Sequence, residues 1–278
     1  MEPLPPGTTV AEPEAGADPE PDGGPSSPAS GRRAPRHRTG TRHRRLVRLA
    51  IVLVVVTVLP CAAGVVYELA LPGVADARAR VVAIDRAHGG TPAGLPLPRK
   101  LSEAIVSVED EHFYSNVFVN VAEGAGRAAI ATLERSGDPG GSTIEQQLAK
   151  QLYPHGPGLA GTLSEIGLGV KLALTYSKPE ILAMYLDAIY YGNGYWGDVA
   201  AARGYFGVRP DQLTWAEASL LAGLPQAPSS YDPVHHLALA RRRQWHVLTR
   251  LVADHVLTAT QADAVDRAPL PLQRRPRG

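Results

Sequence analysis

Cysteine is nearly absent from this sequence, since its 278 residues contain one, Cys61. A single cysteine cannot form a disulfide within the chain, so a folded part must rely on an ordinary hydrophobic core. Aromatic residues are also few, at 6% of the chain. The sequence contains no P-loop, no zinc-ligand spacing and no Gly-x-Ser-x-Gly elbow. These absences exclude a disulfide scaffold and the enzyme classes that depend on those motifs.

Near the N-terminus, one block of the sequence lacks basic residues and the next block lacks acidic residues. Residues 1–31 contain six acids, no Lys or Arg, and many Pro, Gly and Ser, which predicts disorder. Residues 32–48 carry eight Arg and no acid, and taken alone that run is compatible with nucleic-acid binding. From Glu68 onward the chain has 20 basic and 21 acidic residues. No global field therefore attracts a polyanion, and we expect no nucleic-acid partner.

Charged residues are absent altogether from Leu49 to Tyr67, a stretch of 19 residues. As a helix this stretch would be about 28 Å long, close to the thickness of a bilayer core. The Arg-rich run before it is then the cytoplasmic flank, where it also favours contact with anionic lipid. A cleaved signal peptide is disfavoured because the apolar stretch is too long and starts too late. We expect a disordered cytoplasmic tail at 1–48, a transmembrane helix at 49–67 and an extracytoplasmic domain in the cell membrane.

The remainder of the chain is predicted to be helical. Residues 68–100 have the composition of a linker or stalk, in which 77–84 could form a strand or continue a helix. Beyond them the apolar spacing is helical, and no long alternating pattern indicates a strand. The sequence therefore predicts an all-α domain at 101–269 and a disordered tail at 270–278. Capping-box spacing marks four helix starts: Ser142 with Glu145, Ser177 with Glu180, Thr214 with Glu217, and Thr258 with Gln261.

An acidic pair, Glu109 and Asp110, ends an apolar helix-like stretch, and the aromatic residues Phe113 and Tyr114 follow. A carboxylate between apolar neighbours has a reason to carry a raised pKa, as a general base near neutrality needs. Considered alone, such a pair is more typical of a solvated turn at the end of a helix.

A glycine-rich loop opens the next helix, at residues 140–150. Its two glycines let the backbone approach a ligand, and the free amides of the helix start favour an anion. The two glutamines can hydrogen-bond sugar hydroxyls or phosphate, and a lysine follows two turns inside. The alternative is an ordinary capped helix with that lysine in solvent. Candidate binding residues here are Gly141, Ser142, Thr143, Gln146, Gln147 and Lys150.

Two further segments carry candidate residues. Glu165 alone indicates a first-turn acid stabilised by the helix dipole. Tyrosines next to glycines in 185–197, with Tyr191 among them, suit stacking on a sugar, although aromatic residues at helical spacing more often belong to a core.

In order and spacing, these segments resemble the peptidoglycan glycosyltransferase family, glycosyltransferase family 51. The family's first motif is similar to Glu-Asp-x-x-Phe-Tyr and its second to Gly-Gly-Ser-Thr-Ile-x-Gln-Gln. Further matches cover Tyr-Ser-Lys-x-Glu-Ile-Leu, Ala-Ala-Ala-Arg-x-Tyr-Phe-Gly and Leu-Pro-Gln-Ala-Pro-x-x-Tyr-x-Pro. In this chain the matches lie at 109–114, 140–147, 176–182, 200–207 and 224–233.

The resemblance implies a monofunctional, lysozyme-like helical enzyme that polymerises glycan strands from lipid II at the membrane. In that reading Glu109 is the base, and Glu165 aligns with a second essential Glu that positions or stabilises the reacting groups. Asp110, Phe113 and Tyr191 join the glycine-loop residues as candidate substrate contacts. The implied partners are lipid II, the growing glycan strand, membrane lipid and other cell-wall synthesis proteins, with no required cofactor.

The sequence departs from the family pattern at several positions. Asn116 stands where the family commonly has His, and Asp187 where Asn is usual. Gly161 and Thr162 stand where the family has Arg-Lys before the second Glu, and residues 151–164 contain no Lys or Arg, only His155. Lost phosphate contacts are worth about 1.5–3 kcal/mol each.

A divalent cation (Mg²⁺ or Mn²⁺), a partner protein, or Lys150, Lys171 and Lys178 could compensate for the missing cations. Two alternatives remain open beside the polymerase, namely a non-catalytic glycan-binding or scaffold protein and a glycan-cleaving enzyme. The two retained acids, Glu109 and Glu165, argue against a pure scaffold, and the glycine-rich loop argues against cleavage.

Overall fold

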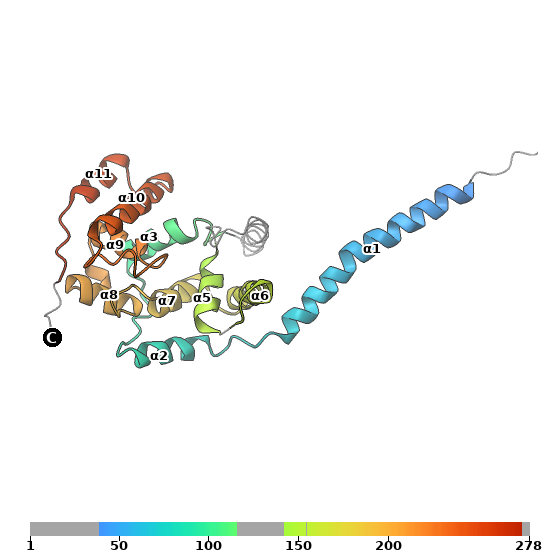
Figure 1. The fold of residues 1–278 in the computed structure, drawn as a ribbon, viewed down its shortest axis with the longest axis horizontal. Coiled ribbons are helices and arrows are strands. Elements are labelled where there is room, and N and C mark those ends of the chain that lie inside the picture. Colours follow the sequence, from blue (N-terminus) through green and yellow to red (C-terminus); the bar gives the residue numbers. More distant parts are fainter. Residues whose placement is uncertain (1–38, 116–141, 154, 274–278) are drawn as a thin grey trace, which may run out of the picture. The chain divides into compact units, whose positions relative to one another are not determined.

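The structure is a computed structural model that describes residues 39–115, 142–153 and 155–273. Within these ranges the chain forms α-helices, one 3₁₀ helix and no strand (Figure 1). An isolated antiparallel bridge joins Tyr190 to Trp196. The prediction of an all-α domain is therefore confirmed for the described residues.

In chain order, the helices are α1 (Thr39–Ala70), α2 (Ala77–Ala87), α3 (Arg99–Glu109), α5 (Ile144–Leu152), α6 (Leu159–Thr175), α7 (Lys178–Ala188), α8 (Gly197–Phe206), η1 (Pro210–Gln212), α9 (Trp215–Gly223), α10 (Leu237–Ala253) and α11 (Ala259–Arg267).

The chain divides into two compact units, Met1–Val58 and Leu59–Gly278. The described part of the first unit is helical from Thr39, so α1 begins inside the segment predicted to be disordered. Across the described residues, no helix is both long enough and apolar enough to cross a membrane. The membrane span at 49–67 therefore stays a prediction.

The second unit is built around α7. In Figure 1, α5, α7 and α8 lie between α2 on one side and a group formed by α3, α9 and α10 on the other, and α11 packs on α10. Every residue of α7 from Ile181 to Ala188 is buried. A helix that is apolar on all sides belongs in a core, so α7 is the central element of the domain.

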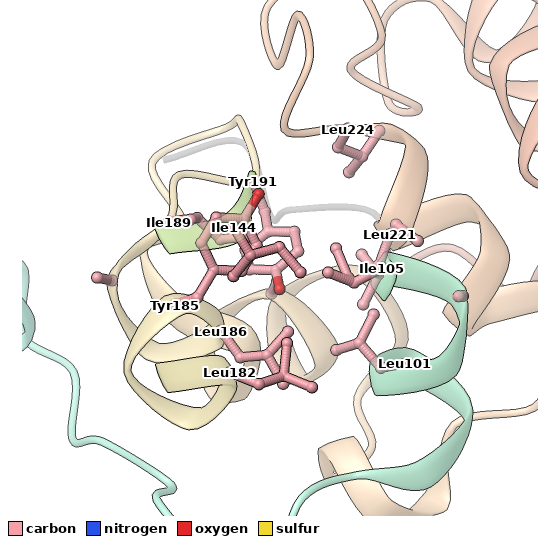
Figure 2. Packing of buried hydrophobic residues seen from close by; sticks show 14 of the residues in the cluster. Leu101, Ile105, Ile144, Leu182, Tyr185, Leu186, Ile189, Tyr191, Leu221 and Leu224 are labelled. Atoms are coloured by element: carbon pink, nitrogen blue, oxygen red, sulfur yellow. The ribbon is translucent and has the colours of Figure 1, made fainter. Parts of the chain in front are cut away.

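The core joins α7 to α3 and α9. Figure 2 shows Leu101 and Ile105 of α3 directed toward Leu182 and Leu186 of α7, with Leu221 of α9 next to them. All five side chains are 0–1% exposed. This packing fixes the C-terminal end of α3, where Glu109 lies.

Two segments predicted to lie outside the domain contribute to it. Within 68–100, residues 77–84 were predicted to form either a strand or a helix. They belong to α2, which buries Ala77 and Val81. At the C-terminus, the backbone amide of Gln273 donates to the Tyr205 carbonyl at 2.7 Å. Residues 274–278 of the predicted tail lie outside the described residues.

Three of the four predicted capping boxes are confirmed, at Ser177, Thr214 and Thr258. The fourth prediction, Ser142 with Glu145, is wrong by one residue, because Thr143 is the N-cap of α5 and Gln146 completes its box. Both Ser and Thr can cap a helix, so local chemistry did not distinguish the two positions.

Candidate active site

Glu109 ends α3 and is held by two groups from other helices. Its Oε2 accepts a hydrogen bond from Gln147 Nε2 at 3.0 Å. Its Oε1 lies 3.6 Å from a terminal guanidinium nitrogen of Arg243, and both of these side chains are 12% exposed. An amide donor and a cation both stabilise the ionised carboxylate, which is the form that accepts a proton.

Gln147 is oriented by Tyr185. The Tyr185 hydroxyl donates to Gln147 Oε1 at 2.7 Å, which leaves the amide nitrogen to face Glu109. Burial, with the Glu109 charge nearby, raises the pKa of Tyr185 well above its usual value, so the hydroxyl keeps its proton and remains a donor. A chain of three side chains from α3, α5 and α7 therefore fixes the carboxylate.

Arg243 reaches Glu109 because Gly223 has no side chain. The Arg243 Nε donates to the Gly223 carbonyl oxygen at 3.3 Å, and a Cβ at Gly223 would lie 2.8 Å from Arg243 Cγ. Sequence reasoning did not select Arg243 as a site residue. Its signal was the basic run 241–243, which the sequence places just before an apolar helical face.

A second arginine of α10 also holds the end of α3. Arg250 Nε donates to the Ser107 carbonyl oxygen at 3.2 Å, and its guanidinium pairs with Glu111. Arg243 and Arg250 are seven residues apart, which is two turns along one face of a helix. A cation is favourable beside the carbonyl groups at a helix C-terminus, so α10 positions Glu109 through the backbone as well as through its side chain.

The segment at the start of α5, which follows the glycine-rich loop, contacts the end of α3 next to Glu109. Asp110, which is buried, accepts from the backbone amide of Ile144 at 3.2 Å. The Gln146 side chain completes the cap by accepting from the Thr143 amide at 3.2 Å. Ser142 is exposed, and its carbonyl accepts from Gln147 at 3.4 Å. These contacts join the end of α3 to the start of α5.

Two predicted site residues have buried rings. Phe113 and Tyr191 are both 0% exposed, and burial raises the pKa of the Tyr191 hydroxyl well above its usual value. The ammonium group of Lys178 lies 4.5 Å from the Phe113 ring centroid and 2.6 Å from Glu145 Oε1. Substrate contact by these two rings stays a prediction, as it does for Gly141, which lies outside the described residues.

Glu165 lies on α6 and pairs with His155. The His155 Nε2 is 2.6 Å from Glu165 Oε1, and the Glu165 side chain is 22% exposed. One turn later on the same face, a Cβ at Gly169 would lie 3.2 Å from the Gln146 backbone. The Glu165 face of α6 therefore packs against α5, the helix that supplies Gln147.

The three lysines considered as replacement cations differ in their availability. Lys171 donates to the carbonyl oxygen of Leu71 at 2.7 Å, and Lys178 is paired with Glu145. Lys150 is exposed on α5. Among the described residues, no group of three His, Cys, Asp or Glu side chains could hold a metal ion, and dependence on a divalent cation stays a prediction.

Two departures from the family pattern have structural explanations. At Gly161, a Cβ would overlap the carbonyl oxygen of Gly156, so an arginine does not fit there in this arrangement. Asp187 accepts from the backbone amides of Ala93 at 2.8 Å and Gly94 at 3.1 Å. Its carboxylate therefore holds the segment that leads into α3. Asn116 lies outside the described residues.

The all-α domain holds the Glu109 carboxylate between Gln147 of α5 and the Arg243 guanidinium of α10. This arrangement is a candidate acid–base site. The family model described as transglycosylase matches residues 91–252. This match covers more than half of the chain, and the chain belongs to the transglycosylase family.

Relatives in bacteria agree with this assignment. A Cupriavidus necator protein with a provisional transglycosylase name is 38% identical over 187 residues, covering 66% of this chain and 80% of that protein. Penicillin-binding protein 2D of Bacillus subtilis is 38% identical over 173 residues, covering 62% of this chain and 25% of that protein. Penicillin-binding protein 1A of Neisseria flavescens is 35% identical over 179 residues, covering 64% of this chain and 22% of that protein.

The chain therefore spans a quarter or less of these two penicillin-binding proteins. A crystal structure of penicillin-binding protein 1A from Haemophilus influenzae is 35% identical over 34% of this chain and 14% of that chain, with a TM-score of 0.33. That structural overlap is too small to bear on the fold.

Proposed function

We propose that the protein is a peptidoglycan glycosyltransferase that polymerises glycan strands from lipid II. One observation carries the proposal within this family. The Glu109 carboxylate is largely buried, yet it is stabilised as an anion by Gln147 and faces Arg243. An ionised carboxylate that is held in a fixed position can accept a proton from a sugar hydroxyl that binds within hydrogen-bond reach of it.

In the proposed reaction, Glu109 removes the proton of the acceptor sugar's 4-hydroxyl as that oxygen attacks the anomeric carbon of the growing strand's reducing end. The new β-1,4 bond forms with inversion, and the bond to undecaprenyl pyrophosphate breaks. The leaving group takes the bonding electrons, so positive charge beside it lowers the barrier. Lys150, exposed on α5, is the lysine that we assign to this charge.

The test is the variant Glu109→Gln assayed with labelled lipid II in detergent. Loss of a general base is expected to lower the rate by about 10²–10⁴-fold. The matched control is Glu103→Gln, on the same helix and in an i,i+4 pair with Arg99, which should polymerise at the wild-type rate. Wild-type polymerisation by Glu109→Gln would contradict the role of Glu109.

A second candidate function is a non-catalytic glycan-binding or scaffold protein of cell-wall synthesis. The observation in its favour is that Lys171 and Lys178 are occupied by groups of the protein itself. The same assay separates the two functions. A wild-type protein that binds labelled lipid II, and makes no polymer with or without divalent cation, would support the scaffold.

For localisation we propose a single-pass membrane protein with a cytoplasmic N-terminus. The support is the uncharged stretch 49–67 and the Arg-rich run before it. Lipid II is itself membrane-bound, so an anchored enzyme would meet its substrate in the same plane.

A further inference from the structure

His155 lies in the turn between α5 and α6, and both of its ring nitrogens have a partner. Nδ1 is 2.7 Å from the Tyr153 carbonyl oxygen, and Nε2 is 2.6 Å from Glu165 Oε1. A carbonyl oxygen can only accept, so Nδ1 carries a hydrogen. The ring is therefore held between the carbonyl oxygen of its own turn and a carboxylate oxygen of α6.

An imidazolium carries a hydrogen on each ring nitrogen, and in that form the ring has a donor toward each of the two oxygens. The side chains of His155 and Glu165 are 13% and 22% exposed, so solvent weakens the pair less than it would at an open surface.

The turn reaches α6 because of Gly161. A side chain there would overlap the Gly156 carbonyl and would lie 3.5 Å from His155 Cδ2. The missing Cβ lets the turn settle on α6 and brings the imidazole to Glu165. The same glycine occupies the position at which the family resemblance places an arginine.

We infer that His155 is a positioning residue for Glu165: as an imidazolium it orients the Glu165 carboxylate and supplies positive charge to a segment, residues 151–164, that contains no Lys or Arg. The inference rests on the proposed function, in which Glu165 acts on the reacting groups.

The neighbouring elements also carry charged groups. On the α2 side, Arg80 lies 4.5 Å from the Tyr153 ring centroid, and Asp76 accepts from the Tyr153 hydroxyl at 2.8 Å. On the α1 side, Glu68 faces α6 at Gly167, and on α5 Lys150 is exposed. Histidine is the side chain whose charge ordinarily changes near neutrality, so the imidazole is the group of the pair that a change from pH 6 to pH 9 tests.

The experiment compares lipid II polymerisation by the full chain and three variants at pH 6 and pH 9. His155→Gln removes the charge, His155→Lys retains it at both pH values, and His235→Gln is the matched control. His235 is exposed and its Nδ1 is 2.7 Å from Asp232 Oδ2, so the control removes a comparable His–carboxylate contact elsewhere.

At pH 6 we expect His155→Gln to be at least tenfold slower than wild type, and the ratio to approach one at pH 9. His155→Lys should keep the wild-type rate at pH 6 and exceed it at pH 9, while His235→Gln should follow the wild type. A wild-type rate for His155→Gln at pH 6 would overturn the inference, and so would equal rates for the Gln and Lys variants.

A thermal-unfolding cycle gives a readout that does not depend on polymerisation. His155→Gln, Glu165→Gln and the double variant should change Tm non-additively at pH 6, and the coupling should disappear at pH 9. Additive changes at pH 6 would overturn the charge pair. If wild type makes no polymer from lipid II, the proposed function fails, and the cycle still decides whether His155 holds Glu165.

Discussion

At the scale of single residues, three buried carboxylates stand out away from the Glu109 contacts. Asp85, Asp187 and Asp198 come from α2, α7 and α8 and are 2%, 4% and 1% exposed. Burial, with repulsion from the Asp187 charge, raises the pKa of both Asp85 and Asp198 to about 7. Neither side-chain oxygen of Asp198 has a hydrogen-bond partner within the described residues, so its ionisation costs stability.

We predict that Asp198→Asn stabilises the domain at pH 8 and not at pH 5. The folded-state pKa of about 7 lies above the ordinary Asp value. The stability that Asp198 contributes is therefore complete below about pH 4 and is lost as pH rises through 7. A gain of about 1 kcal/mol corresponds to a rise in Tm of about 2–4 °C for a domain of this size.

Thermal unfolding at the two pH values measures this effect. Asp211→Asn is the control, because that acid is exposed and pairs with Arg209 on the surface, and its Tm should change little. A lower Tm for Asp198→Asn at pH 8 would show that the Asp198 anion is stabilised in the fold.

At the scale of elements, an ion pair joins α5 to α7. Glu145 and Lys178 meet at 2.6 Å with side chains 5% and 19% exposed. Removing one partner of a buried pair leaves an uncompensated charge and costs about 3–5 kcal/mol. We predict that Lys178→Met is destabilised by about this amount, and that adding Glu145→Gln restores part of the loss. Denaturant unfolding of both single variants and the double variant measures the coupling, and purely additive losses would argue against it.

The crossing of α9 and α10 gives a second prediction. Gly223→Ala would place a Cβ against Arg243 Cγ and displace the guanidinium from Glu109. We expect at least a tenfold loss of lipid II polymerisation, with folding retained as judged by circular dichroism. Gly73→Ala is the control, since a Cβ there has nothing within 4 Å. Full activity of Gly223→Ala would show that the Arg243 contact is dispensable.

The same elements show what the sequence could predict. The local boxes at Ser177, Thr214 and Thr258 depend on residues three apart, and all three are found. The start of α5 was misplaced because its boundary depends on contacts far along the chain. The Ile144 amide donates to Asp110, 34 residues away, and Glu145 pairs with Lys178.

The candidate site shows the same division between local and distant information. Glu109 and Gln147 were selected from motifs, and the structure brings them together at 3.0 Å. Arg243 was missed because its contact joins α10 to α3 across a gap of 134 positions. The contact of His155 with Glu165 was missed because it depends on how closely the turn approaches Gly161. The hydrophobic periodicity of a sequence does not indicate such a distance.

At the scale of the whole molecule, the sequence predicts attachment to a membrane through 49–67. We expect the full chain to remain in the membrane pellet after washing with alkaline carbonate and to be released by detergent. A variant that lacks residues 1–67 should leave the pellet in carbonate. Release of the full chain by carbonate alone would contradict a spanning helix.

The close approach of Gly156 to Gly161 also constrains how this molecule can change over generations. An arginine introduced at 161 would meet the Gly156 carbonyl before its guanidinium could reach any ligand, so one codon change does not recover the family arrangement. The turn would have to lift away first, and that intermediate would forfeit the His155 contact with Glu165. In this arrangement, a long side chain at 161 and the His155 contact with Glu165 therefore exclude each other.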